Sequence, residues 1–187
     1  MTESPRFIVD HNVGKLAKWL RMMGYDTLFF SGDNDSYMLT LAQKEGRVIL
    51  TKDTQIMKRR LVTNGQIKAL LIRGDKPEIQ MHQVISTFNL DPQFKPFSIC
   101  LQCNQPLRER SKPRVKDLVP AYVFQTQSQY MACPACHRIY WRGTHWQAMT
   151  RKLKGFMSGS PEGCIDSPGI IRRKQDERTK RVLEGNR

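Results

Sequence analysis

Two pairs of cysteines are the clearest candidates for chemistry in this sequence of 187 residues. Each pair has the form Cys-X-X-Cys, and 29 residues separate the pairs, which consist of Cys100, Cys103, Cys133 and Cys136. Four thiolates complete a tetrahedral shell around zinc and leave no coordination position open, which is typical of a structural site. The sequence therefore predicts a structural zinc ion held by these four cysteines.

Other uses of the cysteines are less favoured. A redox role would require two Cys-X-X-Cys motifs to act independently, and disulfides are rare in a reducing compartment. His137 follows the last cysteine of the pairs and could replace it as a ligand. Because the separation between the pairs exceeds the usual spacing, we expect an inserted basic loop over residues 106–120. Cys164 is assigned no role.

Aspartates form the second set of candidates, because each of four predicted strands is followed within a few residues by at least one. In a parallel sheet these positions share the carboxyl edge, where open α/β folds bind their ligands. Gathered carboxylates favour a hard cation such as Mg²⁺ or Mn²⁺, although each aspartate could equally serve as a turn residue or helix cap. The residues concerned are Asp10, Asp33, Asp35, Asp53 and Asp75.

The elements that must position these residues follow from the spacing of apolar side chains. We expect strands over residues 7–10, 27–30, 47–51 and 67–72. The helices between them are one that ends near Gly24, one capped by Asp35 or Ser36, a short one over 56–61 and one beginning at Pro77. This alternation predicts an α/β fold with a mostly parallel sheet covered on both sides.

The composition changes after residue 95, and we expect domains over residues 1–95 and 96–154 with a disordered basic tail over 155–187. Residues 121–124 and 129–131 are predicted to be strands of a zinc ribbon. Thr144 is expected to cap a helix that includes Trp146, Met149 and Leu153, with Trp146 packing the ribbon against the first domain.

The charge of the chain favours a polyanion as partner, nucleic acid first. Lysine and arginine number 31 against 17 acidic residues, which gives a net charge of +14. A soluble protein with solvated lysines is the alternative reading. No apolar run is long enough to span a membrane, and no glycine-rich motif for a nucleotide cofactor occurs. The first residues lack a secretory signal, so we expect a cytoplasmic protein.

Several motifs occur in order along the chain, namely residues 7–10, 16–26, 45–53 and 140–146 together with the two cysteine pairs. In this combination the sequence resembles the RNase domain family named for the C-terminal part of the nematode Mut-seven protein. The resemblance covers roughly residues 5–153. Members of that family look like PIN-type nucleases, with a three-layer α/β/α domain followed by a zinc ribbon.

The resemblance implies a metal-dependent ribonuclease with an acidic site at the sheet edge. Asp10 and Asp53 match the aspartates that would hold Mg²⁺ or Mn²⁺, and Asp35 and Asp75 match outer acids. The paired acids usual before the second helix read Asn34-Asp35 here, so Asp33 could substitute. The four cysteines of the two pairs match the zinc ligands of the ribbon.

RNA is the substrate that the resemblance implies, and no histidine is required as general base. Phosphates could be received by basic side chains close to the acidic turns, namely Lys15, Lys18, Arg21 and Lys52. One alternative is an RNA- or ribosome-binding module without a catalytic metal, which the asparagine at position 34 keeps open. Another is a different phosphotransfer enzyme built on a similar sheet.

Overall fold

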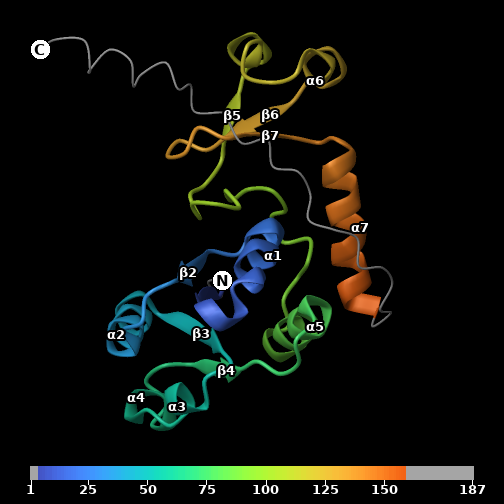
Figure 1. Ribbon diagram of the computed structural model, residues 1–187. Coiled ribbons are helices and arrows are strands. Elements are labelled where there is room, and N and C mark those ends of the chain that lie inside the picture. The colour runs from blue at the N-terminus through green and yellow to red at the C-terminus, as the bar shows by residue number, and fades with distance from the viewer. Residues whose placement is uncertain (1–3, 159–187) are drawn as a thin grey trace, which may run out of the picture.

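The first half of the chain forms a four-stranded parallel sheet. The computed structural model describes residues 4–158 (Figure 1). The strand order is β2-β1-β3-β4, with all neighbours parallel. The strands are β1 (Arg6–Asp10), β2 (Thr27–Phe30), β3 (Arg47–Thr51) and β4 (Ala69–Leu71). The four predicted strands are therefore present, and β4 is shorter than the predicted range 67–72.

Helices connect these strands, and glycines end two of them. The helices are η1 (His11–Val13), α1 (Lys15–Met23), α2 (Asp35–Glu45), α3 (Thr54–Met57), α4 (Arg60–Thr63) and α5 (Pro77–Phe88). Gly24 and Gly46 follow α1 and α2 in the left-handed conformation, with φ of 93° and 61°. The predicted short helix over 56–61 is in fact two, α3 and α4.

The cap of α2 differs from the prediction. Asn34 precedes the helix, and its side-chain oxygen accepts a hydrogen bond of 3.0 Å from the backbone N–H of Tyr37. Asp35, one of the two predicted caps, is instead the first residue of the helix. Asparagine caps a helix as well as aspartate does, so the amide at position 34 has a local structural role.

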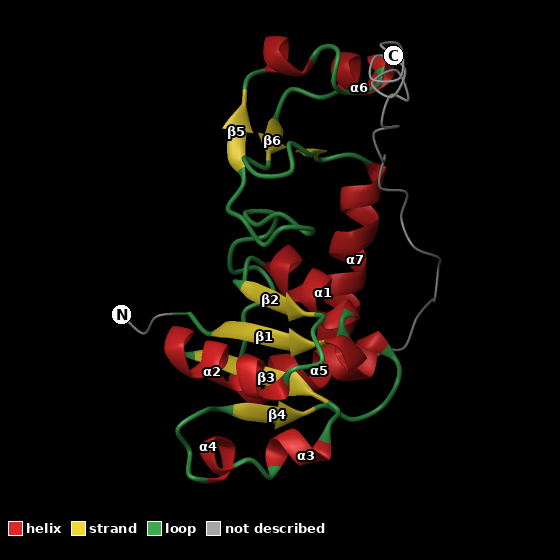
Figure 2. Cartoon of the chain, turned by 60° about the vertical axis from the view of Figure 1, so that its left-hand side comes forward, coloured by secondary structure: helices red, strands yellow, loops and turns green. Residues whose placement is uncertain are grey.

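Helices cover both faces of the sheet (Figure 2). Successive strand residues point to opposite sides, so apolar runs place apolar side chains on both faces, and the helices bury them. Phe7 and Val9 belong to a core that includes residues of α1 and α5, whereas Ile8 lies in a second core with Met38 and Ala42 of α2. The chain is thus a mixed α/β protein with a core on each side of its parallel sheet. No helix in the described part of the chain is both long and apolar enough to span a membrane.

The cysteine-containing part of the chain, residues 98–141, is called the cysteine module below. Its antiparallel sheet has the order β5-β6-β7, and its elements are β5 (Arg108–Arg110), η2 (Lys112–Val115), α6 (Ala121–Thr126), β6 (Tyr130–Ala132) and β7 (Ile139–Trp141). The predicted loop over 106–120 therefore contains a strand and a short helix.

The predicted strand over residues 121–124 is wrong, because these residues lie in helix α6. Val123 on this helix packs with Val115 and Tyr130 in a small buried core. The hydroxyl of Tyr130 donates to the backbone oxygens of Val123 and Gln127, at 3.0 and 3.1 Å. These tertiary contacts stabilise a helical turn in an apolar run too short to show its period.

Helix α7 (Thr144–Ser158) follows the cysteine module and returns to the first domain. Its Leu153 and Phe156 are buried in the core that also contains residues of α1 and α5. Trp146 lies against Phe97, with ring centroids 5.4 Å apart. Of the predicted tail, residues 155–158 are helical, and residues 159–187 lie outside the described residues.

A buried arginine joins β3 to the turn before β2. Arg47 is 7% exposed and donates to both carboxylate oxygens of Asp26, at 2.8 and 3.0 Å, and to Glu45 at 2.7 Å. Burial alone would raise the pKa of Asp26, but the hydrogen bonds from Arg47 and Asn104 outweigh it and lower this pKa. The charged form of Asp26 therefore stabilises the fold.

This pair predicts an acid-sensitive contribution to stability. A pKa lowered by folding stabilises the protein above the pKa of the unfolded state, about 3.9 for aspartate, and the contribution is lost as the pH falls through the folded value. The Asp26 side chain is 37% exposed, so Asp26→Asn should lower the free energy of unfolding at pH 7 by only about 1–2 kcal/mol. Urea unfolding at pH 7 and at pH 3 measures both effects. Asp117→Asn, at an exposed site, is the matched control. It should change neither the free energy of unfolding at pH 7 nor its difference between pH 7 and pH 3.

Candidate metal centre and acidic edge

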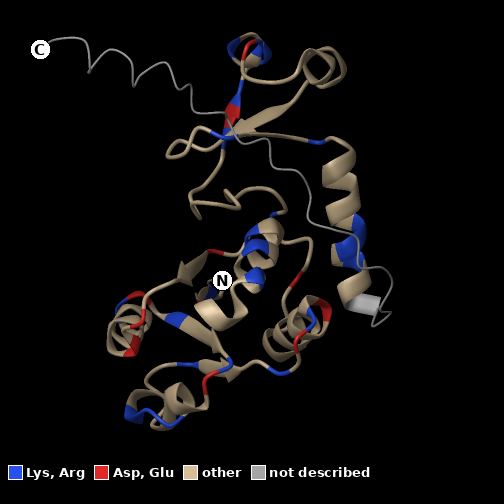
Figure 3. Cartoon of the chain, viewed as in Figure 1, with Lys and Arg blue, Asp and Glu red and all other residues tan. Residues whose placement is uncertain are grey.

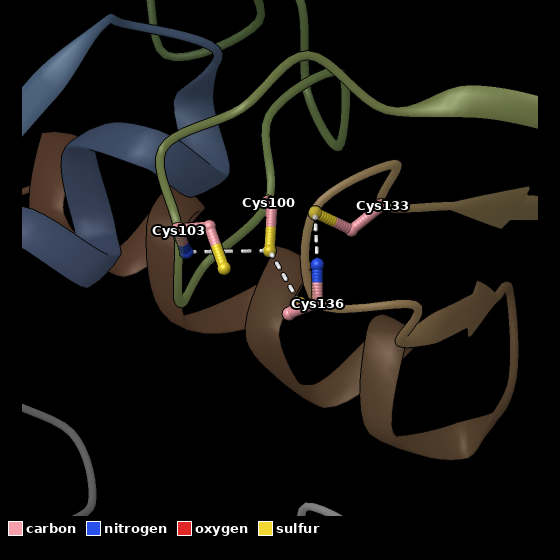
Figure 4. Close-up of side chains that lie close together, drawn as sticks. All are labelled: Cys100, Cys103, Cys133 and Cys136. Atoms are coloured by element: carbon pink, nitrogen blue, oxygen red, sulfur yellow. Dashed lines mark hydrogen bonds between the residues drawn. The ribbon is translucent and has the colours of Figure 1, made fainter.

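The four cysteines of the two pairs form one cluster, although each cysteine of one pair is 30 or more positions from both cysteines of the other pair in sequence. Their sulfur atoms all lie within 4.8 Å of one another (Figure 4). Cys100 and Cys133 are buried, and Cys103 and Cys136 are partly buried. The cluster does not include His137, the alternative ligand. The donor set and its spacing fit a tetrahedral metal ion, and a four-cysteine shell favours zinc.

The two cysteine turns have the same local geometry. In each, the second cysteine's backbone N–H donates to the first cysteine's sulfur, at 3.4 Å for Cys103 and 3.5 Å for Cys136. The residue after each turn, Asn104 or His137, adopts a positive φ of 60° or 57° and donates its N–H to the first cysteine's carbonyl. N–H groups directed at sulfur stabilise thiolates, the form that binds a metal.

The thiols differ in their acidity. Burial, together with the neighbouring Cys136 and Cys100, raises the pKa of Cys103 to about 12. Burial also works to raise the pKa of Cys136, but hydrogen bonds from the Arg138 backbone and the other cysteines lower it to about 7. Binding of a divalent cation by this cluster would therefore release protons, and we expect the affinity to rise with pH.

Arg21 connects the first cysteine turn to the α/β domain. It lies on α1, is 6% exposed, and its guanidinium donates to the backbone oxygens of Thr27, Leu101 and Gln102 at 2.8, 2.9 and 3.1 Å. These donors are occupied inside the protein, contrary to the expectation that Arg21 receives phosphates. Arg21 is therefore left out of the RNA contacts proposed below.

Asn104 makes a second connection at the same edge of the sheet. Its side-chain oxygen accepts a 2.8 Å hydrogen bond from the backbone N–H of Thr27, and its amide nitrogen donates to Asp26. Because β2 is an edge strand, the cysteine turn covers backbone groups that would otherwise be open to pairing. The geometry of the cysteine cluster and the stability of the parallel sheet are thus physically linked.

Removal of the Arg21 guanidinium should weaken both parts of the chain. In Arg21→Met three backbone oxygens lose a charged donor, and we expect a loss of about 2–4 kcal/mol in the free energy of unfolding. Zinc affinity should fall as well, because Leu101 and Gln102 lie between the first two cysteines. Urea unfolding and competition with a chromogenic zinc chelator measure the two effects. Lys18→Met, an exposed site on the same helix, should leave both unchanged.

Asp10 ends β1 at the carboxyl edge of the sheet, as predicted, and is only 4% exposed. Its Oδ2 accepts hydrogen bonds of 2.7 Å from both the Thr51 hydroxyl and the Asn12 amide. Its Oδ1 lies 2.8 Å from Nδ1 of His11. The carboxylate is therefore fixed by three neighbours. Sequence reasoning missed Asn12 and Thr51, although both lie within two residues of a predicted aspartate.

The other aspartates have individual local partners. Asp53 caps α3 by accepting a 2.7 Å hydrogen bond from the N–H of Gln55, and its own N–H donates to the Thr51 hydroxyl at 2.9 Å. Asp75 is exposed and bonds to Lys52, and Asp35 lies 3.8 Å from Arg59. Thr51 thus links the turns of Asp10 and Asp53. Within residues 4–158, however, the carboxylates do not form a ready-made cluster of three metal ligands.

Basic side chains lie on both parts of the molecule (Figure 3). Lys15 and Lys18 are exposed on α1, whereas Lys52 is partly buried and held by Asp75. On the cysteine module, four exposed cations lie on or beside β5 and η2 without an acidic partner among the described residues, namely Arg108, Arg110, Arg114 and Lys116. These cations provide a positive surface away from the acidic edge.

Comparison with known proteins identifies one family. The model of the Mut7-C RNAse domain matches residues 5–153, which includes the parallel sheet, the cysteine module and most of α7. No curated protein and no solved structure gives a significant match. The match contains both the buried aspartate of β1 and the four clustered cysteines. The chain therefore belongs to the Mut7-C RNAse domain family.

Proposed function

We propose that this protein is a cytoplasmic, metal-dependent ribonuclease that hydrolyses RNA phosphodiester bonds on a PIN-like α/β domain, with a zinc ribbon that aids RNA binding. Membership of an RNAse domain family supports the reaction class. The observation that supports a site at the carboxyl edge of the parallel sheet is the placement of Asp10 there. Its carboxylate is buried and is held by Thr51 and Asn12.

Asp10 and Asp53 would hold Mg²⁺ or Mn²⁺ between them. Asp35 and Asp75 would be outer ligands or ligands of a second metal ion. Thr51 suits this role because its hydroxyl bonds to Asp10 and to the backbone of Asp53, and so orients both turns. Such a cation supplies charge stabilisation for the phosphate oxygens and lowers the pKa of water. The carboxylates present are hard oxygen donors, which fits either ion.

Substrate phosphates would lie along the exposed Lys15 and Lys18 of α1 and against Lys52. Lys52 must then leave Asp75, which is inexpensive because Asp75 is 97% exposed and an exposed ion pair contributes little. The unpaired cations of the cysteine module would contact further phosphates without reading the base sequence. A zinc ion at the four cysteines would hold β5 and its cations in place.

The metal dependence of cleavage tests this proposal. Wild-type protein carrying its zinc is incubated with labelled single-stranded RNA, with and without added Mn²⁺, and zinc content is measured in parallel. We expect cleavage with Mn²⁺ and none without it, while RNA binding is retained in both. Equal cleavage in the two arms would contradict a catalytic cation, and binding without cleavage in both would contradict the nuclease itself.

A second candidate function is that of an RNA- or ribosome-binding module. The observation that favours it is that Asp53, Asp35 and Asp75 each have a local partner, and Asn34 caps α2 where the family usually has an acid. This candidate predicts tight RNA binding that weakens steeply with salt, and no cleavage with any divalent ion.

A further inference from the structure

We propose that Phe30 and Tyr37, called the aromatic pair below, form a subsite on which one unpaired base of RNA stacks beside the acidic edge. The inference rests on the RNA substrate of the proposed function and deepens it, because it gives that substrate as single-stranded rather than duplex RNA. Two observations carry it. The rings of the pair have centroids 6.2 Å apart, and Phe30 lies next to Asp10 in the parallel sheet.

The register of the sheet places the aromatic pair at the proposed site. Asp10 and Phe30 are the last residues of β1 and β2, and they are partners in the parallel pairing of these strands. Side chains alternate along a strand, so Asp10 points to the same face as Ile8, which lies in the core shared with α2. Phe30 packs against that core too. The Phe30 ring and the Asp10 carboxylate therefore extend from adjacent positions on the α2 side of the sheet.

Tyr37 presents a large ring to solvent. It is the third residue of α2 and is 59% exposed. The helix cap uses only its backbone N–H, which donates to the side chain of Asn34 at 3.0 Å. A single exposed aromatic residue is common on protein surfaces. A tyrosine that lies against a second ring, next to a buried carboxylate, offers a flat apolar surface to a ligand of that site.

The Phe30 ring is held in place by the turn that follows β2. A Cβ at position 32, which is glycine, would lie 3.1 Å from Cζ of Phe30, closer than an ordinary contact. The turn thus passes close to the tip of the ring, and Gly32 permits this approach because it has no side chain. The planes of Phe30 and Tyr37 are inclined at 39°, so the rings do not cover each other as parallel rings would. A ring that is fixed in advance loses little entropy when a base stacks on it.

Cations near the start of α2 favour RNA over an apolar protein as the occupant. Arg59 lies 3.8 Å from Asp35, which is two residues before Tyr37, and the Arg59 side chain is 48% exposed. Lys58 and Arg60 flank it and are exposed as well. Three consecutive cations complement the phosphates of a nucleic acid, whereas an apolar partner would desolvate them without pairing them. Aromatic rings beside a positive surface are typical of sites that bind single strands.

The kind of RNA follows from the geometry of stacking. In a duplex each base is paired and lies between its neighbours in the strand, so its face is not available to a protein ring. An unpaired base can turn its face onto Tyr37 while its phosphate reaches the acidic edge. Every base has such a face, so the subsite binds single strands with little preference for sequence.

Binding measured without added Mn²⁺ tests the inference, because no cleavage is then expected. Full-length wild type, Tyr37→Leu and Tyr37→Phe are titrated with a short oligoadenylate, with a ribose-phosphate chain of the same length that lacks bases, and with duplex RNA. We expect Tyr37→Leu to weaken binding of the oligoadenylate about tenfold and to leave the Kd of the other two ligands within twofold of wild type. Tyr37→Phe keeps the ring and should retain wild-type affinity. Tyr122→Leu, at an exposed tyrosine on α6, is the matched control and should retain it as well.

The outcomes separate this inference from the proposed function. An oligoadenylate Kd within twofold of wild type in Tyr37→Leu overturns the subsite in favour of an apolar protein partner. Equal loss of affinity for the chains with and without bases also overturns it, because such a loss shows a defect in phosphate contacts or in folding. Absence of RNA cleavage by wild type in Mn²⁺, with the tenfold loss present, contradicts the ribonuclease and retains the base-stacking subsite. Cleavage by wild type without that loss retains the ribonuclease alone.

Discussion

RNA cleavage is expected to fall by about 10³-fold when Asp10 and Asp53 are both replaced by asparagine, with RNA affinity within threefold of wild type. Asparagine keeps the size of each side chain and one oxygen. It can therefore still accept the hydrogen bonds that Thr51 and Asn12 give to Asp10 and that Gln55 gives to Asp53. The variant removes two negative charges from the edge where a divalent cation would bind. Initial rates in Mn²⁺ measure the effect.

The control for this variant is Asp117→Asn, which removes a charge from an exposed site of the cysteine module. It should cleave RNA at the wild-type rate. Zinc content and the far-ultraviolet circular dichroism spectrum should be the same in all three proteins, because neither Asp10 nor Asp53 touches the cysteine cluster. A double variant that cleaves within threefold of wild type would contradict the catalytic role of these carboxylates.

Replacement of Cys100 by serine should have the largest effect on stability. Zinc held by a structural site contributes about 10–16 kcal/mol of apparent binding free energy at pH 7, and most of it is lost with one ligand. Cys100 is buried, and its sulfur lies 3.6 Å from that of Cys136 and 3.1 Å from the Tyr140 hydroxyl. We expect loss of the bound zinc and unfolding of the cysteine module.

The parallel sheet should also lose stability in this variant, because Arg21 and Asn104 join the first cysteine turn to β2. Thermal unfolding followed by circular dichroism, together with metal analysis, measures both consequences. Cys164→Ser, the matched control outside the two pairs, should retain one zinc per chain and the wild-type Tm. An unchanged Tm after removal of the metal from wild type would show that the cluster does not stabilise the fold.

The α/β half of the fold could be predicted from the sequence because its signals are local and strong. Short apolar runs predicted β1, β2 and β3, and Gly24 predicted the end of the helix between β1 and β2. The prediction failed at residues 121–124, where the helix α6 depends on contacts with Val115 and Tyr130. The four-residue run by itself gives no sign of these contacts, and a short apolar run does not distinguish a strand from a helix.

The candidate site was predicted in part for the same reason. Asp10 was proposed as a site residue because it ends a buried strand, but the sequence contains no local signal that Thr51 would bond to it across 41 positions. Arg21 was expected to receive phosphates because it lies close to the acidic turns in sequence. The cysteine turn that buries it comes from 80 residues further along the chain. Burial by a distant segment is decided by packing rather than by local pattern.

The sequence by itself determined the types of chemistry available to this protein. Two Cys-X-X-Cys pairs specify a soft thiolate site, and aspartates after successive strands specify hard oxygen donors, because these preferences belong to the side chains themselves. Only the tertiary structure decided which of these polar side chains have hydrogen-bond partners inside the protein and which are exposed to solvent. In the folded protein the Arg21 guanidinium donates to backbone oxygens, and the Asp53 carboxylate caps α3. The Asp10 carboxylate is held by Thr51, Asn12 and His11. The contacts of Arg21 with Leu101 and of Asp10 with Thr51 are hydrogen bonds between segments far apart in sequence, and such bonds form only when the chain has folded.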